Sequence, residues 1–397
     1  LRAMMHRLLL SLLLIFVSFP LLAAEPPRPK VGLVLSGGAA RGLAHIGVLK
    51  ALEEQGIQID AIAGTSMGTV VGGLYASGYK AEELEKLALG IDWQQALSDA
   101  PPRKDVPFRR KQDDRDFLVQ QKLSFRDDGS LGLPLGVIQG QNLALLLESM
   151  LAHASDTRDF DKLPIPFRAV ATDIASGEKV VFRRGHLPQV IRASMSIPAV
   201  FAPVELDGRL LVDGGMVDNI PLDVAREMGV DLAIVVDIGT PLRSRKELAT
   251  VVDVLNQSIT LMTRRNSEEQ LAALHRDDIL IQPPLASFGV TDFGRAQEMI
   301  DAGYRAARAL DARLATLKRP EENDVELNVA RSPSQRNPVI TAIRIENDSK
   351  VSDDVIRFYI RQPIGEPLEL GRLQTDMGTL YGLDYFDRVQ YRVVHKG

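Results

Sequence analysis

One short pattern in the sequence combines the residue types needed for a serine nucleophile. The segment Gly64-Thr65-Ser66-Met67-Gly68 has the form G-x-S-x-G and lies between an apolar run, residues 61–64, and a helical pattern, residues 67–76. A sharp strand-to-helix turn would expose the Ser66 hydroxyl above a sheet, and the glycines would remove Cβ clashes there. The N-terminus of the following helix would place partial positive charge near a developing anion. The pattern predicts a nucleophile at Ser66, with a purely structural turn as the alternative.

A second glycine-rich turn lies earlier in the chain, at Ser36-Gly37-Gly38-Ala39-Ala40-Arg41-Gly42. It follows an apolar run and opens a helical pattern, so its backbone N–H groups could bind a phosphate or a tetrahedral oxyanion. A phosphate site of the dinucleotide type would need G-x-G-x-x-G and an acidic residue at the end of the next strand. Here Ala39 stands at the second glycine position, and the next strand ends in Gly64-Thr65-Ser66. The oxyanion interpretation is therefore favoured over nucleotide binding.

A serine nucleophile also needs a proton acceptor, and none of the six histidines is an obvious member of a Ser-His-Asp triad. His45 and His186 are kept as alternative bases. Asp213 has a better setting, because it ends an apolar run and precedes Gly214-Gly215. At the carboxyl end of a parallel strand it would point into the crevice where open α/β sheets bind ligands. An aspartate that only caps the turn at Gly214-Gly215 is the alternative.

These residues require elements that position them, and the pattern predicts strands that alternate with helices. Short apolar runs predict strands at residues 31–35, 61–64, 168–172, 179–182, 210–212, 232–237 and 279–281. Apolar positions at helical spacing predict helices at residues 40–55, 67–76, 141–153, 222–228, 248–274 and 295–317. Strand–helix alternation indicates an α/β fold with a parallel sheet covered on both faces.

Composition narrows the class of protein. The 397 residues are 45% hydrophobic and 25% charged, which is an ordinary globular composition, and the length suggests two or three folding units. With 47 Lys and Arg against 52 Asp and Glu, the net charge of −5 argues against a general nucleic-acid binder. The chain has no cysteine, which excludes a cysteine nucleophile, disulfides and a cysteine-ligated zinc site.

The two ends of the chain are expected to be separate units. A basic head precedes the apolar run Leu8–Ala24, which is the order of a secretory signal peptide over residues 1–24, with a membrane anchor as the alternative. Residues 318–338 have the composition of a linker, across which few contacts are expected. Beyond it, residues 339–397 predict a small α+β unit, with strands near 341–345 and 389–393 around a helical pattern at 370–381.

The three motifs together resemble the patatin-like phospholipase family: Gly37-Gly38-Ala39-Ala40-Arg41-Gly42, then Gly64-Thr65-Ser66-Met67-Gly68, then Asp213-Gly214-Gly215. Similar flanking residues occur at 44–49, 193–199 and 219–221, and the resemblance covers residues 30–317. It implies a three-layer α/β/α domain with a mostly parallel sheet. The implied activity is hydrolysis of lipid acyl esters, of the phospholipase A or lysophospholipase type, on a phospholipid or lysophospholipid at a membrane surface.

The resemblance also implies roles for particular residues. Ser66 matches the nucleophile and Asp213 the proton acceptor of a Ser-Asp dyad without histidine, and Gly37–Gly42 matches the oxyanion hole. Ala39 departs from the pattern, because the family usually has a third glycine there, but a backbone N–H is kept. No metal, organic cofactor or nucleic acid is implied. A general serine esterase shares the nucleophile logic and is an alternative function.

Residues 339–397 resemble a POTRA domain that lacks its last strand. This resemblance implies a bacterial chain exported by the signal peptide and located at the outer membrane or cell surface, or secreted, with the POTRA unit in the periplasm. It further implies a natural chain that continues into an outer-membrane barrel. A non-enzymatic secretion or outer-membrane assembly component is the alternative function that this unit alone would favour.

Overall fold

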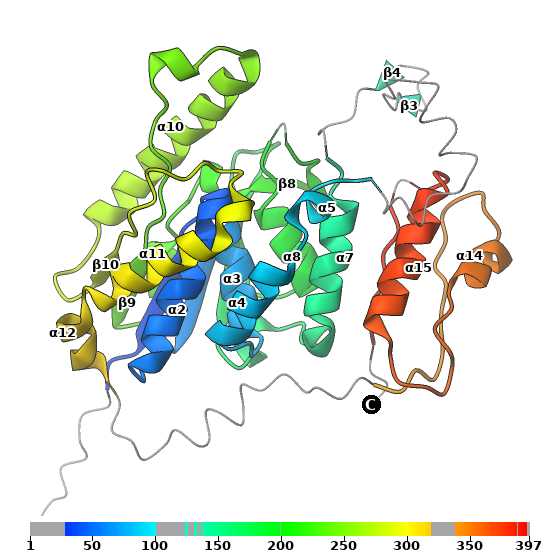
Figure 1. Ribbon diagram of the computed structural model, residues 1–397, viewed down its shortest axis with the longest axis horizontal. Helices are drawn as coiled ribbons and strands as arrows, with labels where there is room; N and C mark the ends of the chain where they lie inside the picture. The colour runs from blue at the N-terminus through cyan, green and yellow to red at the C-terminus, as the bar shows by residue number, and fades with distance from the viewer. Residues whose placement is uncertain are drawn as a thin grey trace, which may run out of the picture.

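One mixed β-sheet forms the centre of the larger part of the chain in the computed structural model (Figure 1). The structure describes residues 28–100, 124–125, 131–132, 136, 138–198, 200–318, 338–386 and 388–394. The strands run in the order β10-β9-β1-β2-β5-β8-β7, and β6 also pairs with β5. Their bounds are β1 Val31–Leu35, β2 Ala61–Thr65, β5 Phe167–Asp173, β6 Lys179–Phe182, β7 Val204–Leu206, β8 Arg209–Asp213, β9 Leu232–Val236 and β10 Ile279–Ile281. A separate two-stranded pair joins β3 Ser124–Phe125 to β4 Leu131–Gly132.

Strands β10, β9, β1, β2 and β5 pair in parallel and form the centre of this sheet. Every residue of β1, β2 and β9 is buried. Continuous apolar runs such as those of β1 and β9 are typical of parallel strands, because helices cover both faces and no side chain faces water. The seven strands expected from such runs are all present, which confirms the predicted α/β class.

Helices cover both faces of the sheet and make the domain a three-layer α/β/α structure (Figure 1). Side chains of β1, β2 and β9 alternate between two apolar clusters, so the clusters lie on opposite faces. The first cluster includes residues of α2 Ala44–Glu54, α3 Met67–Ala76, α4 Ala81–Gly90, α7 Gln141–Met150, α8 Leu187–Ser194 and α11 Ala296–Arg308. The second includes residues of α9 Leu222–Glu227 and the end of α10 Val251–Ala272.

The sheet is not parallel throughout, and this corrects the reason given above for the position of Asp213. Strand β8 pairs antiparallel with β5, with Asp213 opposite Ala171. Strand β5 pairs in parallel with β2, with Val170 opposite Thr65. Strand β8 therefore begins beyond the carboxyl edge of the parallel strands and runs down to it. Asp213 reaches the level of the end of β2 because β8 is short and ends there.

The terminal residues 338–394 form a small unit around a third apolar cluster. It contains two helices, α14 Asp353–Tyr359 and α15 Leu370–Gly382. Neither strand expected at 341–345 and 389–393 is present; the described part of this unit has one isolated bridge, Val339 to Pro367, and no ladder. Alternation decides which side chains face a cluster, but a strand also needs a neighbouring backbone with which to pair. The expected strands are therefore wrong, and the POTRA resemblance stays a prediction.

The terminal unit packs against α7. Leu145 of α7, only 2% exposed, belongs to the apolar cluster of the terminal unit. The side chain of Gln141 donates to the C=O of Val389, and its Oε1 accepts the N–H of Val389 at 3.1 Å. The expectation that few contacts cross the linker is therefore wrong for α7. Residues 1–24 and nearly all of the 318–338 linker lie outside the described residues. Within the described ranges, no helix has the length and apolar character needed to cross a bilayer.

Candidate active site

Ser66 stands at the junction of β2 and α3 in a backbone conformation that side-chain-bearing residues rarely adopt. Its φ is 54° and its ψ is −123°. Such a turn reverses the chain sharply and projects the side chain away from the strand. The Oγ of Ser66 donates a 2.5 Å hydrogen bond to Oδ2 of Asp213, 147 positions away in the chain. Both residues are buried, at 4% and 7% exposure.

The two glycines of G-x-S-x-G are required by close backbone contacts around this turn. A Cβ on Gly68 would lie 2.2 Å from the carbonyl oxygen of Leu35, and a Cβ on Gly64 would lie 2.6 Å from that of Gly68. Both distances are far below van der Waals contact. Only glycine at these positions lets the start of α3 pack onto the ends of β1 and β2, which is what fixes the position of Ser66.

Ser194, at the end of α8, supports the turn from the other side. Its Oγ accepts the backbone N–H of Ser66 at 2.9 Å and donates to the C=O of Val170 at 2.6 Å. Thr69 shares a 2.8 Å hydroxyl contact with the same Oγ. Ser194 was noted in the sequence only within the flanking similarity at 193–199, without a role. A buried serine shows no spacing signal of its own, so sequence reasoning missed this support.

Asp213 begins a tight turn in which its carboxylate accepts two hydrogen bonds. Its Oδ1 accepts the N–H of Gly215 at 2.8 Å, while Oδ2 accepts the Ser66 hydroxyl. A Cβ on Gly214 would lie 2.3 Å from the C=O of Val170, so this glycine lets the turn pack against β5. Burial raises the pKa of Asp213 to about 6, and the two hydrogen bonds oppose that rise. The capping contact with Gly215 and the contact with Ser66 therefore coexist, because each carboxylate oxygen has a different partner.

The glycine-rich loop after β1 lies beside Ser66, since a Cβ on Gly37 would come within 2.9 Å of the Cβ of Ser66. The N–H of Gly37 donates to the C=O of Asn219 at 3.3 Å, and that of Ala40 donates to the C=O of Val290 at 3.1 Å. Among the described residues, no hydrogen bond takes the N–H of Gly38 or of Ala39. Gly38 and Ala39 thus offer N–H groups that no described residue accepts. The geometry does not support Gly37 or Ala40 in that role.

The remaining loop residues hold it in place. Ala39 has a φ of 51°, the left-handed conformation that explains a glycine preference at this position. The buried guanidinium of Arg41 donates to the C=O of Phe288 at 2.9 Å and of Gly239 at 2.7 Å, and desolvation lowers its pKa. A Cβ on Gly42 would lie 2.1 Å from the Cγ of Met67. Arg41 and Gly42 therefore anchor the loop to neighbouring segments.

None of the histidines in the described residues hydrogen-bonds to Ser66. His45 is fully buried, its Nε2 lies 2.8 Å from the C=O of Ser36, and desolvation lowers its pKa to about 4. His186 pairs with Glu148 at 2.7 Å, and Nε2 of His153 contacts the C=O of Ser77 at 3.1 Å. The two histidines held as alternative bases therefore have structural partners of their own. The part of the chain that the structure describes also holds no cluster of His, Cys, Asp or Glu suited to a metal ion.

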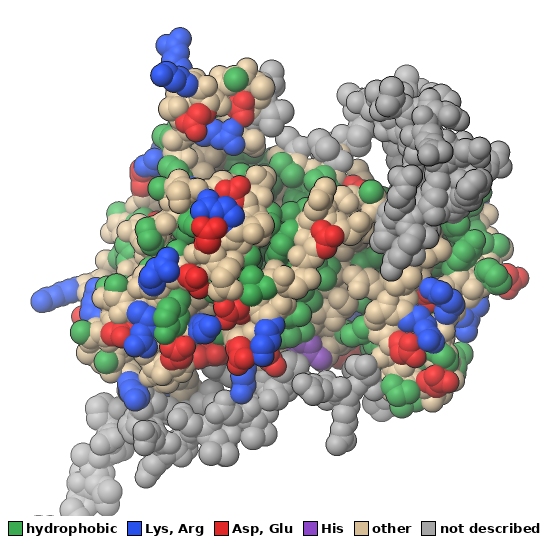
Figure 2. Space-filling model, viewed as in Figure 1, with side chains coloured by type: hydrophobic (Ala, Val, Ile, Leu, Met, Phe, Trp, Pro, Cys, Tyr) green, Lys and Arg blue, Asp and Glu red, His purple; other side chains and the backbone are tan. Residues whose placement is uncertain are grey.

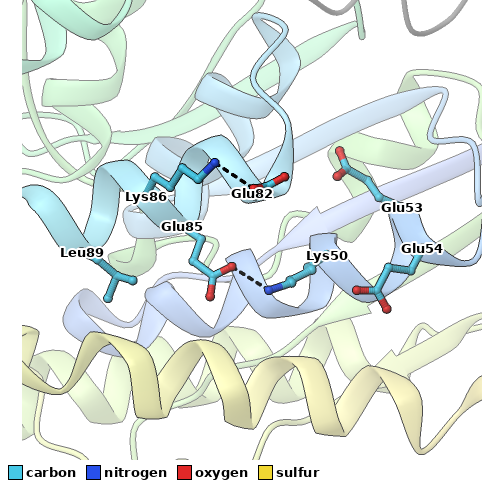
Figure 3. A pocket seen from close by; sticks show the side chains of 7 residues that line it. All are labelled: Lys50, Glu53, Glu54, Glu82, Glu85, Lys86 and Leu89. Carbon is cyan, nitrogen blue, oxygen red and sulfur yellow. Dashed lines mark hydrogen bonds and ion pairs between the residues drawn. The ribbon is translucent and has the colours of Figure 1, made fainter.

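A surface hollow elsewhere on the domain is not a comparable site. Its lining side chains come from α2 and α4 (Figure 3): Lys50, Glu53, Glu54, Glu82, Glu85, Lys86 and Leu89. Lys50 pairs with Glu85 and Lys86 pairs with Glu82, each at 2.8 Å. Positive and negative side chains are intermixed over this face of the molecule (Figure 2). Paired, exposed charges of this kind are typical of a solvated surface, and neither Ser66 nor Asp213 lines the hollow.

Fold and site together define a class: a three-layer α/β/α domain with a buried serine–aspartate pair beside a glycine-rich loop with free N–H groups. A sequence model described as patatin-like phospholipase matches residues 33–226. Residues 33–226 therefore form a domain of the patatin-like phospholipase family.

Individual relatives cover different shares of the chain. An uncharacterised NTE family protein of Mycobacterium tuberculosis is 37% identical over 210 residues, which are 53% of this chain and 49% of that protein. Patatin-like phospholipase domain-containing protein 6 of Homo sapiens is 27% identical over 307 residues, which are 70% of this chain and 20% of that protein. The chain thus spans about half the length of the mycobacterial relative. Among solved structures, VipD from Legionella pneumophila has a TM-score of 0.41 at 19% identity, covering 72% of this chain and 67% of that one.

Proposed function

We propose that this chain hydrolyses acyl esters of phospholipids or lysophospholipids, with Ser66 as nucleophile and Asp213 as proton acceptor. The observation that carries the proposal is the 2.5 Å hydrogen bond between Ser66 Oγ and Asp213 Oδ2 at a strained strand-to-helix turn. Membership of the patatin-like phospholipase family supports a lipid as the substrate.

The proposed reaction has two halves. Ser66 Oγ attacks the acyl carbonyl carbon while its proton passes to Oδ2 of Asp213, and the N–H groups of Gly38 and Ala39 stabilise the oxyanion. Collapse of the tetrahedral intermediate releases the alcohol, which takes the proton from Asp213, and leaves an acyl-Ser66 ester. Water then attacks that ester while Asp213 again accepts a proton. The bond between the acyl carbon and Ser66 Oγ breaks, the proton passes from Asp213 to Ser66 Oγ, and the fatty acid leaves. The reaction as written uses no metal or organic cofactor.

The burial of Asp213 suits this role. A carboxylate with an ordinary pKa is a weak base, and a pKa of about 6 brings it closer to the working pH. The base must be ionised to accept a proton, so kcat/KM should rise with pH through about 6 and level off above it.

The decisive experiment pairs a fluorophosphonate label, with mass mapping of the adduct, with fatty-acid release from phospholipid vesicles. We expect the adduct on Ser66 and a loss of several orders of magnitude for Ser66→Ala, as is typical when a catalytic serine is removed. Asp213→Asn should be similarly inactive, and His153→Gln, in a residue remote from the pair, should retain turnover. An adduct elsewhere, or near-normal release by Ser66→Ala, would refute the proposal. Hydrolysis of short soluble esters only would identify a general esterase, and no hydrolysis by the intact chain would favour the assembly-component alternative.

We also propose that the chain is exported and acts at the bacterial envelope. The proposal is supported by the basic head and the apolar run Leu8–Ala24. Mass analysis of the protein recovered from cells should find an N-terminus at Glu25. An intact N-terminus in a cytoplasmic fraction would contradict export.

A further inference from the structure

Asn266 of α10 bridges both ends of the turn that follows Asp213. Its Nδ2 donates to the C=O of Gly215 at 2.9 Å. Its Oδ1 accepts the N–H of Asn219, also at 2.9 Å. One side-chain amide therefore satisfies backbone groups four residues apart, in the way that a capping residue holds a turn closed.

Two neighbouring side chains extend this contact along the same face of α10. Ser267, which is buried, accepts a 3.3 Å hydrogen bond at its Oγ from Nδ2 of Asn219. Gln270 accepts the N–H of Asp223 at 3.3 Å. Asn266 and Gln270, at positions i and i+4, lie on the same face of the helix, and Ser267 follows Asn266 directly. Helix α10 therefore holds the segment 215–223 at successive points.

The clamped turn is connected to both halves of the proposed site. At one end, the N–H of Gly215 donates to Oδ1 of Asp213 at 2.8 Å. At the other end, the C=O of Asn219 accepts the N–H of Gly37, in the loop that carries the free N–H groups. A displacement of this turn would therefore move the proton acceptor and the glycine-rich loop relative to Ser66.

From these contacts we infer that Asn266 is a positioning residue of the proposed hydrolase site, acting through the 215–219 turn on Asp213 and on the glycine-rich loop. The inference rests on the proposed function, and it names a residue that lies outside all three sequence motifs. Asn266 is not a catalytic residue, since its contacts are with backbone groups of the turn.

Two kinds of measurement separate positioning from a general structural role. Misplacement of reacting groups by about 1 Å can cost about a hundredfold in rate, so Asn266→Ala should lower kcat by that order while KM changes little. Loss of the clamp should also weaken the Gly215 hydrogen bond, which holds the pKa of Asp213 down. The acid limb of kcat/KM should then move to higher pH.

Asn266→Asp serves as a second variant that keeps the acceptor for Asn219 but loses the donor to Gly215. It also adds a negative charge beside the same turn, which raises the pKa of Asp213. The acid limb of kcat/KM should therefore move to higher pH, and further than in Asn266→Ala. Asn256→Ala is the matched control, because Asn256 lies on the same helix and is removed from the turn. Its kcat and acid limb should be those of the unaltered chain.

The assay is fatty-acid release from phospholipid vesicles by the full chain, with a thermal melt for each variant. A reduced kcat with an upward-shifted acid limb in both Asn266 variants, and neither change in Asn256→Ala, supports the inference. Unchanged kcat and pH profile in a folded Asn266→Ala overturns it, and so does a loss of activity that only follows the loss of folded protein. If the unaltered chain releases no fatty acid, the proposed function itself is wrong. That outcome differs from a failure of the inference about Asn266, in which the unaltered chain is active.

Discussion

Helices α3 and α15 both contain glycines, but these glycines meet different surroundings. In α3, a Cβ on Gly68 would collide with the backbone of β1, and Cβ atoms on Gly72 and Gly73 would come within 3.0 Å of isoleucine side chains. In α15, a Cβ on Gly371 or Gly378 would meet nothing within 4 Å. The helix that follows the proposed nucleophile is thus fixed by close contacts at its glycines, whereas α15 is held by its apolar side chains.

Buried carboxylates differ between the same two regions. Asp376 of α15 is fully buried and accepts hydrogen bonds from the guanidinium and the backbone N–H of Arg361. Asp213 is almost as buried, but its partners are a hydroxyl and a peptide N–H, with no cation. A buried charge without a cation costs stability. The buried carboxylate of the terminal unit is therefore paired with a cation, and the buried carboxylate of the proposed site is not.

Gly68→Ala should have the largest effect. The added Cβ would lie 2.2 Å from a backbone oxygen, so strand or helix must shift, and we expect a loss of about 3 kcal/mol or more in the free energy of unfolding. Fluorophosphonate labelling of Ser66 should fall with it, because Ser66 lies two residues away. Chemical denaturation measures the change in stability. Gly371→Ala is the control, which should lose no stability and leave the labelling of Ser66 unchanged. If Gly68→Ala and Gly371→Ala were equally stable, the glycines of α3 would not be more tightly packed than those of α15.

Asp213→Asn should have an intermediate effect on stability, and in the stabilising direction. The pKa of about 6 for Asp213 in the folded chain exceeds the ordinary aspartate pKa of 3.8, so the unaltered chain loses stability as pH rises through this interval. Asn removes that cost, and we expect a gain of roughly 1–3 kcal/mol at pH 8 that disappears near pH 4. Asp376→Asn should instead lose about 1–2 kcal/mol, because it weakens bonds to a charged partner. Denaturation at several pH values tests both, and a destabilised Asp213→Asn at pH 8 would contradict this account.

Gly378→Ala should have the smallest effect. The position lies inside α15 with space for a Cβ, and alanine favours helix over glycine by about 0.5–1 kcal/mol. The variant should therefore melt slightly higher than the unaltered chain, with hydrolysis unchanged. A clear loss of stability would show that α15 is packed as tightly as α3.

The sequence predicted the first part of the fold well, for an identifiable reason. Strand β1, strand β2 and helix α3 appear within one residue of their predicted bounds, since each is a mostly apolar run that is followed directly by a serine. Helices α4 and α8 were not predicted. In these two segments the apolar residues are interspersed with charged or small residues. The helical pattern becomes evident only from which side chains are buried in the folded domain.

The predicted strands of the terminal unit show where prediction from the sequence pattern failed. Residues 341–345 alternate well, and side chains such as Ile343 do pack into the terminal cluster, but the backbone has no ladder. Alternation is a property of a single segment. Pairing is a property of two segments, and the pattern of one does not determine whether the other lies beside it.

The sequence by itself determined which turns could do chemistry, because G-x-S-x-G and the glycine-rich loop are local features whose backbone conformation depends on a few adjacent residues. Only the tertiary structure decided how these turns meet. It brought Asp213 to Ser66 by a short antiparallel strand, used the N–H of Gly37 to hold Asn219, and placed Asn266 against the turn beyond. Each of these contacts joins segments distant in sequence, and their register is set by how the sheet and α10 pack, which no local pattern encodes.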